Sequence, residues 1–124
     1  MSKNRKMLII DDIKMNTELF EAEFEDEFEI SVAGNGTEGL TAASAVRPDV
    51  ILLDINMPDM SGIEVMRNLQ ARPETCAIPV VVVTASEYNA ATEQKLRPYA
   101  NFKGFLSKMD SSEIIKKAVY KALK

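Results

Sequence analysis

Two continuously apolar stretches limit what this chain can fold into. One runs from Val50 to Leu53 and the other from Val80 to Val83, and neither contains a polar residue. A strand with one wet face alternates apolar and polar residues, whereas a strand buried on both faces is apolar throughout. Runs this short are typical of strands rather than helices. They therefore predict two central strands of a parallel sheet that is covered on both faces.

The rest of the chain alternates between strand-like and helix-like patterns. Apolar or alternating segments predict strands at residues 6–10, 29–33, 50–54, 79–84 and 103–106. Helical spacing and capping residues predict helices at 13–28, 37–46, 62–71, 88–99 and 110–123. This alternation implies a parallel sheet with helices on both faces, and the mixed polarity of 29–33 places that strand at an edge. Leu19, Phe20 and Phe24 share one side of the first helix, which we expect to face the core.

Length and composition exclude several classes of protein. The 124 residues suffice for one domain but not for two. The net charge of -4 argues against a general nucleic-acid binder, and one Cys with no His excludes a disulfide framework, the usual zinc clusters and Ser-His or Cys-His catalysis. No apolar run approaches the ~18 residues of a membrane span. We therefore expect a single cytoplasmic domain over residues 1–124, without a membrane span or a nucleic-acid partner.

Polar side chains follow the predicted strands at their carboxyl ends. Asp11 and Asp12 follow the first strand, Asp54 and Thr84 end the third and fourth, and Lys108 comes after the fifth. Parallel strands end on one rim of a sheet, where α/β proteins bind their ligands. The converging carboxylates would repel one another, and a hard divalent cation, above all Mg²⁺, would offset this. A carboxylate, a cation, a hydroxyl and an ammonium group are what phosphoryl transfer to Asp54 requires.

These residues, in this order and spacing, resemble the receiver domain of two-component response regulators in its stand-alone form. The matching positions are Asp11-Asp12, Asp54 with Met57-Pro58 and Gly62, Thr84-Ala85, and Lys108. The resemblance implies a flavodoxin-like (βα)5 three-layer sandwich with parallel strands in the order 2-1-3-4-5. It also implies a signalling switch rather than a conventional enzyme. A sensor histidine kinase or phosphotransfer protein would donate the phosphoryl group, and the domain would catalyse its own acceptance and slow hydrolysis.

The resemblance assigns roles at the metal and phosphoacceptor site. Asp54 would be the phosphoaccepting aspartate. Mg²⁺ would be bound by Asp54, Asp12 and the backbone carbonyl of Asn56, with Asp11 acting through water. Asn56 and Ser86 match the positions that tune the lifetime of the phosphoaspartate.

It also assigns roles in the switch. Thr84, Ala85 and Lys108 would bind the phosphoryl group, and Phe105 matches the aromatic residue that turns inward on activation. The change in conformation would control a downstream protein partner through the face between Tyr88 and Ala122.

The sequence departs from the family's pattern in two places. The family usually has Lys-Pro with a cis bond, whereas Met109 follows Lys108 here. A cis bond before a residue other than proline costs ~2.5–4 kcal/mol, and both a trans bond and a strained cis bond are left open. The segment 97–104 lacks the small Gly-Ala pair that usually precedes the fifth strand, and it is slightly longer. We therefore expect an unusual output face there.

Three alternatives remain. The chain could be a receiver module of a larger hybrid kinase or cyclic-nucleotide regulator. Gly34–Gly39 spells the dinucleotide-binding pattern G-x-G-x-x-G, but Glu38 would place a negative charge where pyrophosphate should sit. A phosphatase of the haloacid dehalogenase type would also use a strand-end aspartate. It needs a general acid two residues later, where this chain has Asn56.

Overall fold

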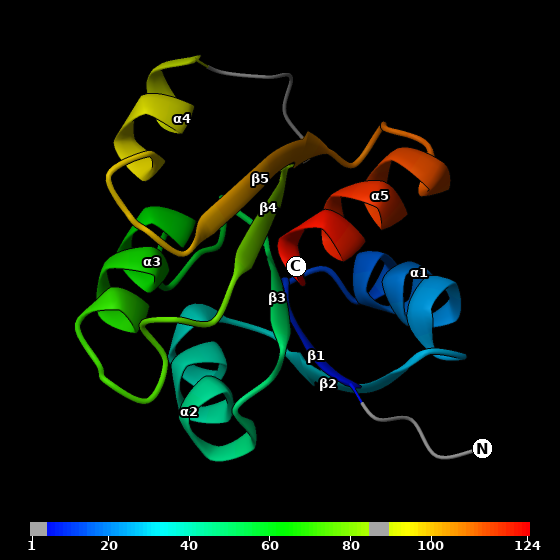
Figure 1. Ribbon diagram of the computed structural model, residues 1–124, viewed down its shortest axis with the longest axis horizontal. Coiled ribbons are helices and arrows are strands. Elements are labelled where there is room, and N and C mark those ends of the chain that lie inside the picture. The colour runs from blue at the N-terminus through cyan, green and yellow to red at the C-terminus, as the bar shows by residue number, and fades with distance from the viewer. Residues whose placement is uncertain (1–4, 85–89) are drawn as a thin grey trace.

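The computed structural model describes residues 5–84 and 90–124, in which strands and helices alternate along the chain (Figure 1). The strands are β1 (Arg5–Ile10), β2 (Phe28–Ala33), β3 (Val50–Leu53), β4 (Val80–Thr84) and β5 (Phe102–Ser107). The helices are α1 (Lys14–Phe24), α2 (Gly36–Val46), α3 (Gly62–Gln70), α4 (Ala90–Leu96) and α5 (Ser112–Ala122). No helix within these ranges has the length and apolar character needed to cross a membrane.

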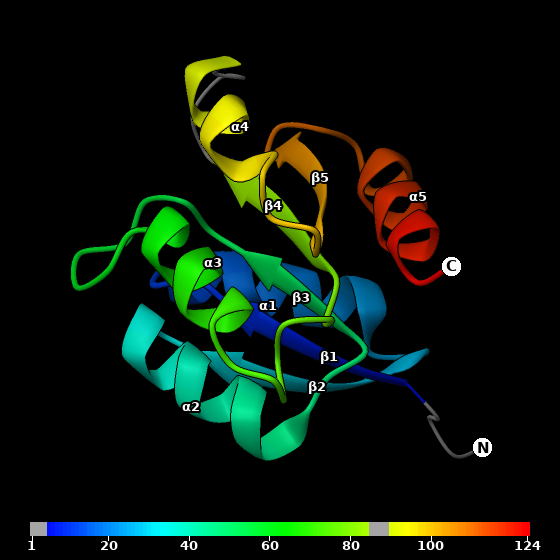
Figure 2. The same cartoon turned by 60° about the vertical axis from the view of Figure 1, so that its left-hand side comes forward.

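The sheet has the predicted topology. Its five strands are all parallel and lie in the order β2-β1-β3-β4-β5, with β3 at the centre and β2 at an edge. Helices α1 and α5 cover one face of the sheet, and α2, α3 and α4 cover the other (Figures 1 and 2). The flavodoxin-like three-layer sandwich is therefore confirmed.

The apolar strands are buried on both faces because their side chains alternate between two cores. In β3, Ile51 and Leu53 pack on the side of α2 and α3, whereas Val50 and Leu52 pack on the side of α1 and α5. All four side chains are at most 1% exposed. Burying one such side chain stabilises the fold by about 1.5–3 kcal/mol, so the central strand holds both helical layers in place.

Helix α1 differs most from the prediction. It ends at Phe24 instead of residue 28, because Phe28 pairs with Arg5 as the first residue of β2. The rings of Phe24 and Phe28 then meet edge to face, 5.8 Å apart. The expectation that Leu19 faces the core is wrong, because its side chain is 64% exposed. The buried face of α1 is the narrower one formed by Thr17, Phe20 and Phe24.

The last third of the chain also departs from its predicted bounds. Helix α4 ends at Leu96 instead of residue 99, and Tyr88, where it was predicted to begin, lies outside the described residues. Strand β5 is bulged, because Val80 pairs with Phe102 whereas Val81 pairs with Gly104, so that Lys103 is skipped. A bulge bends an edge strand and increases its twist. It falls in segment 97–104, where the sequence departs from the family's pattern.

Gly62 marks a close approach between the start of α3 and the end of β3. Its N–H donates to the Ile55 carbonyl at 2.8 Å, and a Cβ atom at position 62 would lie 2.8 Å from the backbone oxygen of Asp54. We expect Gly62→Ala to lower the free energy of unfolding by about 1–3 kcal/mol, because backbone must move to admit the methyl group. Urea unfolding followed by circular dichroism measures this.

Gly34→Ala is the matched control. A Cβ atom at position 34 would meet its nearest neighbour, Oε2 of Glu38, at an ordinary 3.6 Å. The free energy of unfolding of this variant should equal that of the wild type or exceed it by about 0.4–1 kcal/mol, since alanine restricts the unfolded chain. Equal stability of the two alanine variants would contradict the predicted clash.

Candidate functional site

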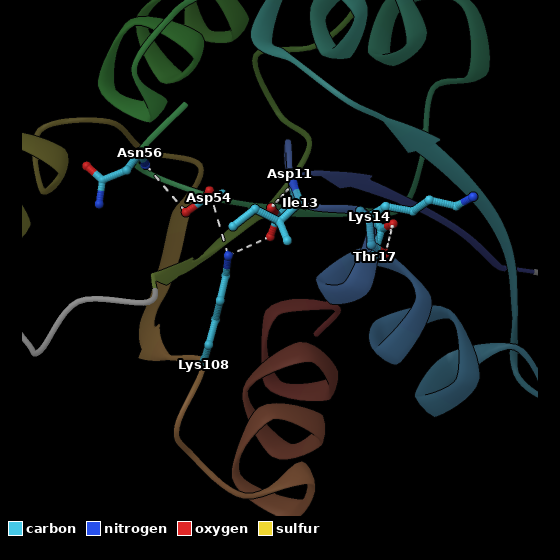
Figure 3. Close-up of polar contacts among 7 residues, drawn as sticks. All are labelled: Asp11, Ile13, Lys14, Thr17, Asp54, Asn56 and Lys108. Atoms are coloured by element: carbon cyan, nitrogen blue, oxygen red, sulfur yellow. Dashed lines mark hydrogen bonds and ion pairs between the residues drawn. The ribbon is translucent and has the colours of Figure 1, made fainter. Parts of the chain in front are cut away.

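The carboxyl end of the sheet brings together charged residues that the sequence singled out, of which Figure 3 shows Asp11, Asp54 and Lys108. Lys108 Nζ lies 2.7 Å from Asp11 Oδ2 and 3.7 Å from Asp54 Oδ2. Asp11 and Asp54 are buried, with 3% and 4% of their surface exposed, whereas Asp12 is exposed. One carboxylate oxygen from each of the three aspartates lies within 4.8 Å of the others. The predicted convergence of these side chains is therefore confirmed.

Backbone hydrogen bonds that continue the sheet place these residues. The Asp54 N–H donates to the Ile10 carbonyl at 2.9 Å, which extends the pairing of β3 with β1 by one residue. The Lys108 N–H donates to the Thr84 carbonyl at 2.8 Å and extends the pairing of β5 with β4 in the same way. Asp54 and Lys108 therefore each lie one residue beyond the end of a strand, where a backbone hydrogen bond fixes their position at the rim.

The turn after β5 holds Lys108 in place without a proline. The Ser107 N–H donates to Asp110 Oδ2 at 2.9 Å, and the Met109 N–H donates to Ser107 Oγ at 3.0 Å. The Asp110 N–H closes the turn on the Ser107 carbonyl at 3.0 Å. The described residues contain no cis peptide bond, so the bond between Lys108 and Met109 is trans. A serine and an aspartate therefore supply the local order at this turn, and Lys108 still reaches the site.

Both carboxylate oxygens of Asp11 have partners. Oδ1 accepts from the Ile13 N–H at 2.9 Å, and Oδ2 forms the ion pair with Lys108 (Figure 3). The N-cap position of α1 is Ile13, and in the described part of the chain no side chain caps this helix. Asp12 is thus left facing solvent beside the two buried carboxylates.

The other predicted site residues lie at or near the same rim. The Asn56 N–H donates to Asp54 Oδ1 at 3.4 Å, and the Asn56 side chain is exposed. Thr84 ends β4 and is 2% exposed. Phe105 in β5 is half-buried against the core beneath α2, α3 and α4. Ala85 and Ser86 lie outside the described residues.

The electrostatics of the site favour a bound cation. Burial raises the pKa of the Asp54 carboxyl from 3.8 to about 6, against the attraction of Lys108, and the neighbouring charges of Asp11 and Asp12 also raise it. Without an added positive charge, the ionised form of Asp54 is therefore disfavoured relative to an ordinary aspartate. Carboxylate and carbonyl oxygens without His or Cys are the ligands of Mg²⁺ and similar hard ions. The residues present thus fit a divalent cation.

The raised pKa of Asp54 predicts a dependence of stability on pH. A carboxyl group that binds its proton more tightly when folded stabilises the fold at low pH, and this stability is lost as pH rises from about 4 through about 6. The variant Asp54→Asn cannot titrate at this position. We expect its free energy of unfolding, relative to that of the wild type, to rise by up to about 3 kcal/mol across this pH window in metal-free buffer. Urea unfolding of both proteins at several pH values measures the difference. A difference that stays constant with pH would contradict it.

The glycine-rich stretch 34–39 has a structural role in this fold. A Cβ atom at Gly36 would lie 2.7 Å from Met60 Cβ, and one at Gly39 would lie 2.6 Å from Ile10 Cδ1. The N–H groups of Gly36 and Thr37 donate to the carboxylate of Asp59, at 3.1 and 3.2 Å. The place where a dinucleotide's phosphates would sit is thus taken by a carboxylate from the protein itself. Close packing accounts for Gly36 and Gly39.

Comparison with known families shows which family this fold belongs to. The model of the response regulator receiver domain matches residues 7–120. This chain belongs to the response regulator receiver domain family. Receiver domains generally take a phosphoryl group on an aspartate and bind Mg²⁺ at an acidic pocket, and a cluster of Asp11, Asp12 and Asp54 is present in this chain. The family acts as a signalling switch in two-component systems, together with histidine kinases or phosphotransfer proteins.

Individual relatives agree with this assignment. The response regulator PleD of Caulobacter vibrioides is 44% identical over 81 residues, which are 64% of this receiver domain and 18% of PleD. The DNA-binding response regulator MtrA of Mycobacterium tuberculosis is 38% identical over 82 residues, which are 65% of this chain and 35% of MtrA. The match therefore covers only a minor part of either relative.

Solved structures resemble this receiver domain over nearly its whole length. The chemotaxis protein CheY4 of Vibrio cholerae superposes with a TM-score of 0.88 at 27% identity, covering 96% of this chain and 98% of that one. The N-terminal domain of a response regulator/sensory box/GGDEF protein from Carboxydothermus hydrogenoformans gives a TM-score of 0.83 at 26% identity, covering 96% and 94%.

Proposed function

We propose that this receiver domain accepts a phosphoryl group on Asp54 in the presence of Mg²⁺ and switches conformation to control a protein partner. The observation that carries this proposal is the burial of the Asp54 carboxylate at the end of the central strand, 3.7 Å from Lys108 Nζ and beside two further aspartates. Residues 1–124 form one such domain in this proposal, and it works in the cytoplasm.

The aspartates divide the work at the metal site. Asp12 and Asp54 bind Mg²⁺ directly, together with the backbone carbonyl of Asn56. Asp11 acts through water, and its two occupied carboxylate oxygens support this role. The ion, when bound, withdraws negative charge from the phosphoryl oxygens and so makes the phosphorus easier to attack.

The protein groups then complete the transfer. A carboxylate oxygen of Asp54 attacks the phosphorus of a phosphohistidine donor, and the phosphorus–nitrogen bond breaks with its electron pair returning to the imidazole. Lys108 pairs with one phosphoryl oxygen, and the hydroxyl of Thr84 donates to another. Asn56 cannot act as a general acid, so the phosphoaspartate is hydrolysed slowly. Asn56 and Ser86 tune this lifetime.

Apolar side chains around the site suit a docking phosphodonor. Met15 and Leu19 on α1 are 70% and 64% exposed, and Met109 beside Lys108 is 87% exposed. Contiguous exposed apolar surface marks protein-binding sites, and we propose that these three side chains contribute to such a surface. We place the histidine kinase or phosphotransfer protein on this side of the rim. The downstream partner binds the face between Tyr88 and Ala122, and Phe105 turns inward when Thr84 and Lys108 engage the phosphoryl group.

Phosphorylation by a small donor tests the proposal. The protein is incubated with acetyl phosphate, with and without Mg²⁺, and its intact mass is measured. We expect a gain of one phosphoryl group that requires Mg²⁺. No gain under either condition, with the fold verified by circular dichroism, would refute the proposal. Steady release of phosphate from a phosphomonoester would instead indicate the phosphatase alternative.

A further inference from the structure

The loop that follows the phosphoacceptor strand is tied to the start of α2 by one side chain. Oδ1 of Asp59 accepts from the Gly36 N–H at 3.1 Å, and Oδ2 accepts from the Thr37 N–H at 3.2 Å and from Thr37 Oγ1 at 3.1 Å. These donors lie 22 and 23 residues away in the sequence. The first N–H groups of a helix lack partners within the helix, so they attract a carboxylate strongly. The Gly36 N–H, foremost among these donors, holds the pKa of Asp59 below its usual value.

Packing reinforces this contact. Met60, the neighbour of Asp59, packs against Gly36. A Cβ atom added to Gly36 would lie 2.7 Å from Met60 Cβ and 3.1 Å from the Met60 sulfur. Asn35 caps α2 separately, through its Oδ1 and the Glu38 N–H at 2.8 Å. Since α2 already has its own cap, the bonds to Asp59 are not needed to begin the helix. What they fix is the position of the loop.

The same loop carries a group that the metal site needs. Asn56, whose backbone carbonyl is a ligand in the proposed function, lies three residues before Asp59. The loop is held at its beginning by the Asn56 N–H bond to Asp54, at 3.4 Å, and at its end by the Gly62 N–H bond to Ile55, at 2.8 Å. The first of these bonds is long. Asp59 therefore supplies an anchor between the two ends.

We propose that Asp59 is a positioning residue that holds the loop 55–61 against α2, so that the Asn56 carbonyl is ready to bind Mg²⁺. This inference rests on the proposed function of the Asp54 site. Groups that orient the ligands of a metal typically contribute about 10- to 100-fold to its affinity. Asp59 acts on a backbone ligand through the intervening loop, so its contribution lies at the lower end of that range.

Two variants at position 59 separate the effect of loop position on Mg²⁺ affinity from the effect of the Asp59 charge. Asp59→Ala and Asp59→Asn remove the same negative charge, but only Asp59→Asn keeps an oxygen that can accept from α2. We expect Asp59→Ala to weaken Mg²⁺ binding about tenfold, and Asp59→Asn to recover a large part of the loss. The Mg²⁺ dissociation constants of the unphosphorylated proteins are measured by calorimetry. An equal loss in both variants, or no loss in Asp59→Ala, would overturn the proposal.

Hydrogen exchange gives a second readout that does not depend on phosphorylation. In the wild type, saturation with Mg²⁺ should slow exchange of the Gly36 and Thr37 amides, because ordering the loop also orders its partner. This coupling should be lost in Asp59→Ala. Thr37→Val keeps the charge and removes one bond, and we expect a smaller loss of affinity. If Asp59→Ala does not fold, Thr37→Val serves as the test. A Mg²⁺ affinity of Thr37→Val equal to that of the wild type would then overturn the proposal. If the wild type itself does not bind Mg²⁺, the proposed function fails instead.

Discussion

Asp54→Asn is expected to abolish phosphorylation by acetyl phosphate and to leave the fold intact. The amide has nearly the shape of the carboxylate but is not a nucleophile at phosphorus. The side chain is 4% exposed among apolar strand ends, and the variant removes one of three crowded negative charges. The protein should therefore unfold no more easily than the wild type at neutral pH. Intact-mass spectrometry after incubation with acetyl phosphate and Mg²⁺ measures the loss.

An exposed aspartate far from the rim provides the control for this variant. Asp26 lies in the turn between α1 and β2 and is exposed. Asp26→Asn makes the same chemical change there, and it should be phosphorylated as fast as the wild type. Undiminished phosphorylation of the Asp54→Asn variant would mean that another side chain is the acceptor.

Asp12→Asn is expected to weaken Mg²⁺ binding by at least about tenfold while preserving the acceptor. Asp12 is the exposed member of the aspartate cluster, so its carboxylate is accessible to an ion from solvent. Its replacement removes both a ligand and a negative charge. Calorimetric titration measures the affinity. Phosphorylation should then recover as Mg²⁺ is raised, which distinguishes this variant from Asp54→Asn.

Asp11→Asn should behave differently from Asp12→Asn. It removes the charge that lies 2.7 Å from Lys108, so the ammonium group loses its nearest partner as well. We expect a smaller loss of Mg²⁺ affinity than in Asp12→Asn, because Asp11 acts through water. A larger loss in Asp11→Asn than in Asp12→Asn would reverse the two assigned roles.

The burial of β3 and β4 on both faces and the convergence of Asp11, Asp54 and Lys108 could be foreseen from the residues. The strand order could be foreseen only from the family resemblance, and the bounds of α1 could not be foreseen. Apolar runs report burial on both faces directly, and parallel strands must end on one rim. Between Phe24 and Phe28 the sequence reads Glu25-Asp26-Glu27, in which nothing breaks a helix. The helix ends there because Phe28 pairs with β1, and such a long-range contact leaves no local pattern.

The site shows the same division between local and distant interactions. Ser107 and Asp110 lie three residues apart, and this spacing of turn-forming side chains could have indicated how Lys108 is held without proline. Asp59 contacts Thr37, 22 residues away, through the direction of one side chain. No sequence pattern reports that direction. Asp11, by contrast, accepts a hydrogen bond from the Ile13 N–H, only two residues away.

The most direct test is to find which residue carries the phosphoryl group. Protein phosphorylated by acetyl phosphate is treated with sodium borohydride, which reduces an aspartyl phosphate to homoserine, and its peptides are sequenced by mass spectrometry. We expect homoserine at position 54 and at no other aspartate. Homoserine at position 11, 12 or 59, with aspartate retained at position 54, would contradict it.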